Sequence, residues 1–122
     1  IAHNAVGSFD KAEFFFHKSV STEPEQSQYW RDYISFLIKL GKKDKALIIL
    51  NEADDFTFGA DLLYCKGVAL YLTGETKKAF EAFEEGLKED FSQHKIIFDI
   101  EPEFLLNKEL QSMISYYQGE HS

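Results

Sequence analysis

Residues 41–53, GKKDKALIILNEA, and residues 74–86, GETKKAFEAFEEG, share the pattern that decides the fold. In both, an Ala comes five residues after the first Gly, a large apolar residue nine after it and a small residue twelve after it. A third copy begins at Gly7, 34 residues before Gly41, and Gly74 follows Gly41 by 33 residues. The aligned residues are Ala12, Ala46 and Ala79, then Phe16, Leu50 and Phe83, then Ser19, Ala53 and Gly86. Self-similarity at a nearly constant period indicates a repeat protein.

The spacing inside each copy is that of an α-helix. Steps of four and three residues place Ala46, Leu50 and Ala53 on one helical face, and the copy at 74–86 has the same steps. A second apolar stripe precedes each of the two later glycines. Its residues are Trp30, Tyr33, Ile34, Leu37 and Leu40 in one copy, and Leu63, Gly67, Leu70 and Tyr71 in the next. Each copy therefore predicts two helices joined by a tight turn, in which Gly caps the first helix in the left-handed region.

The sequence as a whole predicts helices and no strands. The expected helices are 1–6 and 9–20, 27–40 and 43–54, 60–73 and 76–89, a short helix at 92–100 and a last helix at 108–118. Pro24 lies in the expected loop 21–26, and Pro102 is expected to break the chain. Asn107 is the expected N-cap of the last helix. The apolar run at 96–98 is assigned to a helical turn, because the chain offers no strand to pair with it.

The period and the aligned residues resemble the tetratricopeptide repeat, a helix–turn–helix unit of about 34 residues. The matching residues are Trp30, Leu37, Gly41, Ala46, Leu50 and Ala53 in one copy, Leu63, Gly67, Leu70, Gly74, Ala79, Phe83, Gly86 and Leu87 in the next, and Gly7, Phe9, Ala12, Phe16 and Pro24 in an incomplete first copy. The resemblance implies an all-α fold of antiparallel helix–turn–helix repeats stacked as a right-handed superhelix, an α–α solenoid. It implies one domain over residues 1–122, with a partial repeat at 1–25, repeats at 26–58 and 59–91, and a C-terminal cap at 92–122.

The same resemblance implies a binding site. In this family the first helices of successive repeats line a concave groove that commonly holds a peptide or helix of a partner protein. The candidate partner-binding residues at the matching positions are Arg31, Ser35, Lys39, Tyr64, Val68 and Tyr71. Tyr and aliphatic side chains are typical anchors for an apolar segment, and Arg31 and Lys39 are placed to fix its orientation. The alternative is that Tyr64 and Tyr71 pack on the C-terminal segment.

The charge of the chain excludes several kinds of partner. Its 122 residues carry 13 Lys and Arg against 21 Asp and Glu, a formal net charge of −8. This balance lacks the positive field that binding to nucleic acid or anionic lipid requires. No apolar run approaches the roughly 20 residues that span a bilayer, so no membrane insertion is expected. The one cysteine, Cys65, forms no internal disulfide. It leaves the compartment open and favours the cytoplasm slightly over the periplasm.

No motif for catalysis accompanies the repeats. The spacing that is typical of metal ligands is not found among the histidines or between a histidine and Cys65. The histidines are His3, His17, His94 and His121. Cys65 lies in an apolar helical context that is typical of inert packing. Phosphate-binding loops and nucleophile motifs are absent from the sequence. The sequence therefore predicts no enzyme, no metal and no cofactor, and the expected function is the binding of a protein or peptide partner.

Two apolar features support a second function. Phe14, Phe15 and Phe16 cover most sides of a helix, so at least one of them faces away from the core. That residue packs against an upstream helix or forms a protein contact. The expected last helix has an apolar face that either caps the array or forms a dimer contact. The alternative function is therefore structural: self-association as a homo-oligomer, or the terminal part of a longer superhelix or multidomain protein.

Overall fold

The chain is all-helical in the computed structural model, which describes the backbone of residues 2–121 and the side chains of residues 9–120. Helix accounts for 81% of the residues, and the described backbone contains no strand. The α-helices are α1 (Ala2–Thr22), α2 (Ser27–Lys39), α3 (Lys43–Ala53), α4 (Ala60–Leu72), α5 (Thr76–Glu89), α6 (Ile96–Ile100) and α7 (Lys108–His121), and two 3₁₀ helices are η1 (Phe91–Gln93) and η2 (Pro102–Leu106).

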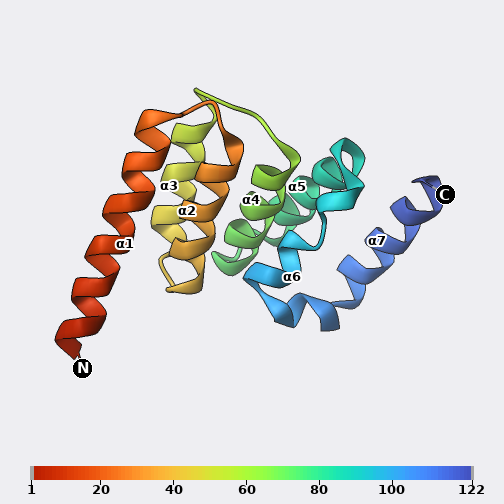
Figure 1. Cartoon of the computed structure of the whole chain (residues 1–122). Helices are drawn as coiled ribbons and strands as arrows, with labels where there is room; N and C mark the ends of the chain where they lie inside the picture. Colours follow the sequence, from red (N-terminus) through yellow and green to blue (C-terminus); the bar gives the residue numbers. More distant parts are fainter. Residues whose placement is uncertain (1, 122) are drawn as a thin grey trace.

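α1 lies at one end of the molecule and α7 at the other, and the remaining helices lie between them (Figure 1). α1 packs against α2, and α2 packs against both α3 and α4. α4 also packs against α3, α5 and α6, and α7 packs against α5. The two ends of the described chain therefore lie at opposite ends of the molecule, with α4 between them (Figure 1).

Both predicted glycine turns are present. Gly41 and Gly74 have φ angles of 79° and 92°, the left-handed region that glycine adopts at little cost. In each turn the N–H of the following residue bonds to a carbonyl oxygen of the last helical turn, at 2.9 Å in both places. This bond, from the third residue past the helix back to its last turn, is the Schellman pattern that ends helices. It reverses the chain between α2 and α3 and again between α4 and α5.

The predicted helices at 27–40, 43–54, 60–73 and 76–89 correspond to α2, α3, α4 and α5. Asn107 caps α7 as predicted, because its Oδ1 accepts a hydrogen bond from the Leu110 N–H at 2.9 Å. The region 92–106 is more divided than predicted. In place of one helix at 92–100 followed by a break, it forms η1, α6 and η2.

The turn expected at Gly7 is wrong. α1 runs without interruption from Ala2 to Thr22 and joins the two helices predicted at 1–6 and 9–20; Ile1 lies outside the described residues. One glycine costs a helix only about 1 kcal/mol relative to alanine. The later part of α1 is held by packing on α2, where Phe36 meets Phe9 at 5.5 Å and Phe16 at 4.9 Å between ring centroids. A glycine ends a helix only where the chain also turns.

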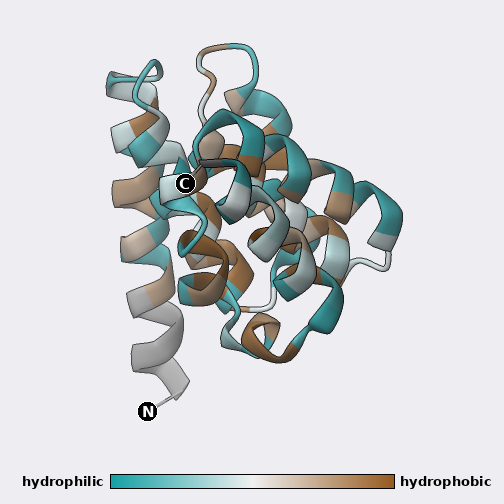
Figure 2. Cartoon of the chain, turned by 90° about the vertical axis from the view of Figure 1, so that its right-hand side faces the viewer, coloured by the Kyte–Doolittle hydropathy of each residue, from teal (hydrophilic) through white to brown (hydrophobic). Residues whose placement is uncertain are grey.

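The small residues of the pattern let neighbouring helices approach closely. Ala46, Ala53 and Ala79 are completely buried. Gly67 of α4 lies directly under the Phe83 ring of α5, where a Cβ would overlap the ring. Figure 2 shows hydrophobic and hydrophilic residues alternating along the helices, as expected when one face of each is buried.

A polar cluster ties α1 to α2 and α3. The Glu13 carboxylate forms an ion pair with Lys45 Nζ, and it accepts a hydrogen bond from the Tyr33 hydroxyl at 3.1 Å. The hydrogen bond from Lys45, aided by that from Tyr33, holds the pKa of the Glu13 carboxyl below its ordinary value of 4.5. The cluster therefore stabilises the docking of α1 only while Glu13 is ionised.

We expect Gly67→Ala to lower the free energy of unfolding by about 1–3 kcal/mol, because overpacking outweighs the gain in helix propensity. The matched control is Gly119→Ala, whose Cβ would meet nothing within 4 Å. Urea denaturation followed by circular dichroism measures both. Equal stability of the two variants would contradict the close packing of α4 on α5.

A second expectation concerns pH. Because the pKa of Glu13 is lowered in the folded state, its contribution is complete above pH 4.5 and is lost as the pH falls through the folded pKa. Glu13→Gln should therefore cost about 1 kcal/mol at pH 7 and progressively less below pH 4.5. Asp10→Asn is the control, since Asp10 is exposed on the same helix and makes no ion pair among the described residues. A pH-independent cost of Glu13→Gln would rule the linkage out.

Candidate functional site

The structure places two of the predicted anchors, Tyr64 and Val68, in the core rather than on a surface. Both are completely buried. The Tyr64 hydroxyl donates to the Asp90 carbonyl oxygen at 2.8 Å, and burial raises the pKa of its phenol well above the ordinary value of 10.0. This part of α4 is covered by the chain itself: the Tyr64 ring lies against Gly86 of α5, and α6 packs elsewhere on α4 and on α2. These two side chains therefore offer no contact to a partner.

Tyr71 is half-buried and packs on the C-terminal segment, as the alternative interpretation expected. Its ring meets Phe104 of η2 edge-on, with centroids 4.8 Å apart. Its hydroxyl accepts a hydrogen bond from Asn107 Nδ2 at 3.4 Å. The rest of Tyr71 lines an open cavity, so it is the one predicted α4 anchor within reach of a ligand.

None of the three predicted residues of α2 lines the cavity that Tyr71 lines. Arg31 is engaged with carboxylates, at 3.6 Å from Asp61 and 3.5 Å from Asp32. Asp61 is buried, so this pair holds α2 against α4 and keeps a buried charge compensated. The Ser35 hydroxyl is 4.0 Å from the Cys65 sulfur. Lys39 is exposed, and within the described chain its ammonium makes no ion pair. The six predicted residues therefore do not form one surface.

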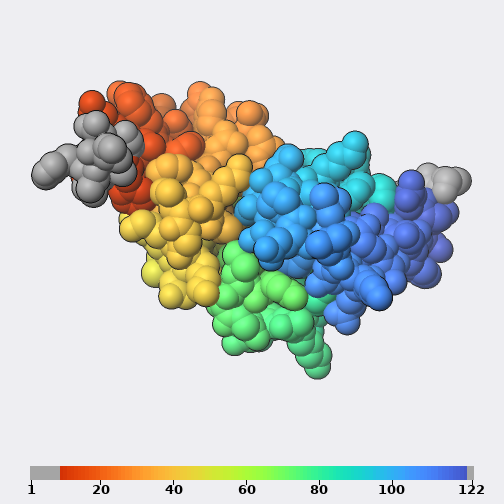
Figure 3. All heavy atoms as spheres, turned by 90° about the horizontal axis from the view of Figure 1, so that it is seen from below, coloured from red at the N-terminus to blue at the C-terminus, as the bar shows by residue number. Residues whose placement is uncertain are grey.

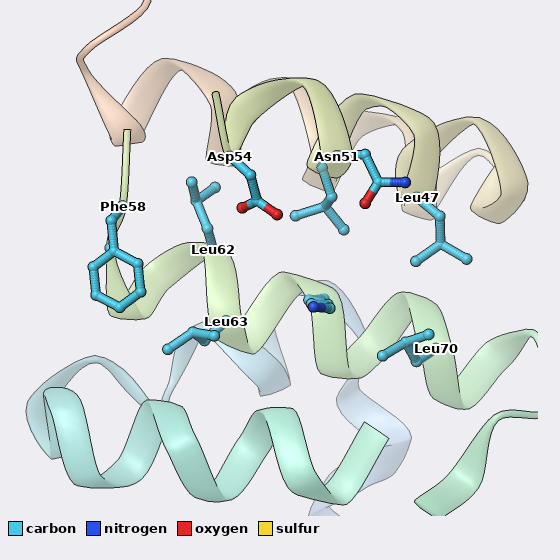
Figure 4. A pocket seen from close by; sticks show the side chains of 10 residues that line it. Leu47, Asn51, Asp54, Phe58, Leu62, Leu63 and Leu70 are labelled. Atoms are coloured by element: carbon cyan, nitrogen blue, oxygen red, sulfur yellow. The ribbon is translucent and has the colours of Figure 1, made fainter. Parts of the chain in front are cut away.

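A groove between α3 and α4 offers the clearest apolar site. Its volume is about 240 Å³, and Figure 4 shows leucines from both helices converging on it. The apolar lining consists of Leu47, Leu50, Phe58, Leu62, Leu63 and Leu70. Leu50 and Leu62 are buried and form its floor, whereas Phe58 stands 66% exposed at one end. The floor is thus fixed by the core, and the rim remains open to solvent.

Two charges of opposite sign border this groove. Asp54 lies on the α3 side and Lys66 on the α4 side. Neither makes an ion pair or a side-chain hydrogen bond with another described residue. The sequence analysis missed this groove, because it assigned the helix faces to one concave surface. The available signal was Phe58, a large aromatic residue in the link before α4.

The corresponding groove between α1 and α3 is different in character. Its volume is about 430 Å³, and polar residues such as Asp10, His17 and Glu52 line it. The ion pair between Glu13 and Lys45 crosses it. Two of its charges, Glu13 and Lys45, are therefore already engaged in holding α1, which leaves the leucine-lined groove as the better candidate for a partner.

The described side chains offer little for catalysis or metal binding. In residues 9–120 no three His, Cys, Asp or Glu side chains gather as metal ligands; His3 and His121 lie outside the described side chains. Cys65 is completely buried, and burial raises the pKa of its thiol from 9.0 to about 12. A thiol in this state is a poor nucleophile at neutral pH.

No family model, curated protein or solved structure matches the chain. None of the described helices combines the length and the apolar character that a membrane span requires. The function must therefore be argued from the geometry.

Proposed function

We propose that this chain is a protein-interaction module of the tetratricopeptide type. In this proposal, two helix–turn–helix repeats, a partial repeat and a C-terminal cap stack as a right-handed α–α solenoid in one domain. The support is the recurrence of one turn, with glycine in the left-handed region, between α2 and α3 and between α4 and α5. The packing of α4 on both α2 and α3 agrees with this arrangement.

The leucine-lined groove between α3 and α4 carries the proposal. Its volume of about 240 Å³ is below the ~300–1,000 Å³ of typical small-molecule sites. It suits instead one or two apolar side chains of a partner peptide or helix, which is how such segments are anchored. Because its floor belongs to the core, the groove is preorganised, and binding orders mainly the partner. The proposed function involves no catalytic step and no cofactor, in line with the buried, protonated Cys65 thiol.

Self-association is the second candidate, and α1 favours it. Phe14 and Phe15 are 64% and 65% exposed, although large aromatic side chains are usually covered. The charges of this helix balance, since Asp10 and Glu13 are matched by Lys11 and Lys18 in a chain of net charge −8. Repulsion between copies is therefore weak at α1.

The test of the groove uses a random peptide library displayed on phage and the whole chain as bait. Phe58→Ser should weaken binding of the selected peptides at least about tenfold, because it removes the exposed edge of the apolar site. Ile48→Ser is the matched control: Ile48 is a comparably exposed apolar residue, at 58%, on α3 but outside the groove. Selection of no peptide, or equal loss in both variants, would reject the groove as the binding site.

The second candidate is tested by sedimentation equilibrium. If α1 mediates self-association, the wild type should sediment as a dimer at concentrations of about 10–100 μM, and the Phe14→Ser/Phe15→Ser double variant should sediment as a monomer. Circular dichroism controls for folding of the variant. A wild type that remains monomeric over this range excludes the candidate.

A further inference from the structure

A second cavity lies at the carboxyl end of α4, between its last turn and η2. Figure 3 views the molecule from this side, where the end of α4 lies beside the segment that contains η2. The cavity has a volume of about 360 Å³ and an apolar wall made by Tyr71, Leu72, Phe104 and Leu106. Phe104 is buried, whereas Leu106 is 85% exposed. An apolar side chain placed here would extend the core packing of Phe104 and cover Leu106.

The rim of this cavity is acidic. Glu101 and Glu103 line it, and no Lys or Arg does. Neither carboxylate forms an ion pair or a side-chain hydrogen bond with any described residue. The remaining polar lining residue, Asn107, is engaged on both sides, with Tyr71 and with the α7 N-terminus. The cavity therefore presents two unneutralised negative charges beside an apolar wall.

The carboxyl end of α4 lies beside these two carboxylates. The last carbonyls of a helix carry partial negative charge and attract cations. One of them already holds an ammonium, since Lys43 Nζ donates to the Leu72 carbonyl oxygen at 2.9 Å. Lys43 does not line the cavity, and Lys108, which follows Asn107, is exposed and does not line it either. The local chemistry thus favours a cation next to an apolar group.

We propose that this cavity binds a basic segment of a partner protein. An apolar side chain of that segment enters between Tyr71 and Leu106, and its neighbouring Lys or Arg side chains pair with Glu101 and Glu103. The net charge of −8 on the whole chain steers such a segment toward this face. An acidic segment would be repelled, and a neutral apolar molecule would leave both carboxylates unpaired. The cavity shares no lining residue with the groove between α3 and α4, so the two proposals stand or fall separately.

The test is an NMR titration of the isotope-labelled chain with three end-blocked pentapeptides. Gly-Leu-Arg-Arg-Gly carries both features of the proposed ligand, Gly-Ser-Arg-Arg-Gly lacks the apolar side chain, and Gly-Leu-Glu-Glu-Gly reverses the charge. The first should shift the backbone amides of residues 71–72 and 101–107 with a millimolar Kd. The other two should bind at least about fivefold more weakly.

The variant Glu101→Gln/Glu103→Gln should raise the Kd of the first peptide about tenfold and remove most of its salt dependence. The matched control is Glu81→Gln/Glu85→Gln, which removes two exposed carboxylates from α5 and changes the net charge by the same amount. Its effect on the Kd should stay below about twofold. Leu106→Ser tests the apolar wall and should also weaken binding, while its amide spectrum reports whether the fold is intact.

Three outcomes would overturn the proposal. The amide shifts could spread over the acidic surface, the control variant could weaken binding as much as Glu101→Gln/Glu103→Gln, or no shift could appear up to about 10 mM peptide. Equal binding of the arginine and glutamate peptides would overturn the charge assignment in the same way. A result in favour requires both localised shifts and the difference between the two carboxylate variants.

Discussion

The contact between α4 and α5 is the interaction on which the remaining structure depends. Each helix supplies a glycine on which an aromatic side chain of the other lies. Phe83 of α5 covers Gly67 of α4, and Tyr64 of α4 lies over Gly86 of α5, where a Cβ would come within 2.8 Å of the Tyr64 ring. Two such reciprocal contacts fix the separation and the axial position of the helices together. Both aromatic rings are completely buried as a result, and this burial stabilises the pair.

α4 is consequently surrounded, and its surroundings determine which surfaces remain open. α5, α2, α3 and α6 all pack against it. α5 covers the side on which Tyr64 was expected to meet a partner, and Val68 is completely buried as well, so neither side chain reaches a surface. Among the openings left around α4 are the groove beside α3 and the cavity at its carboxyl end. The candidate sites are therefore the gaps that the packing of one central helix leaves unfilled.

The sequence predicts those features that depend on how one residue interacts with the backbone next to it. Gly41 and Gly74 could be assigned to turns because left-handed backbone favours glycine strongly, and Asn107 could be assigned to a cap because its short side chain reaches the backbone. Gly7 was assigned wrongly, because the same residue fits inside a helix when no reversal of the chain follows. The site residues were harder to predict. Whether Tyr64 is a ligand anchor or a core residue depends on how α5 and Asp90 lie against it, and no local pattern in α4 contains that information.

The two cavities differ in charge and share no lining residue, but α4 contributes to both, which bears on how they would act together. Asp54 and Lys66 border the groove, while Glu101 and Glu103 border the other site. Coupling between two ligands requires an element with two arrangements that both ligands favour differently. α4 is the only helix that contributes to both cavities, and it is held by the two glycine contacts with α5. Shifting α4 would drive Phe83 or Tyr64 against backbone. The close packing that creates the two sites therefore also makes them independent of each other.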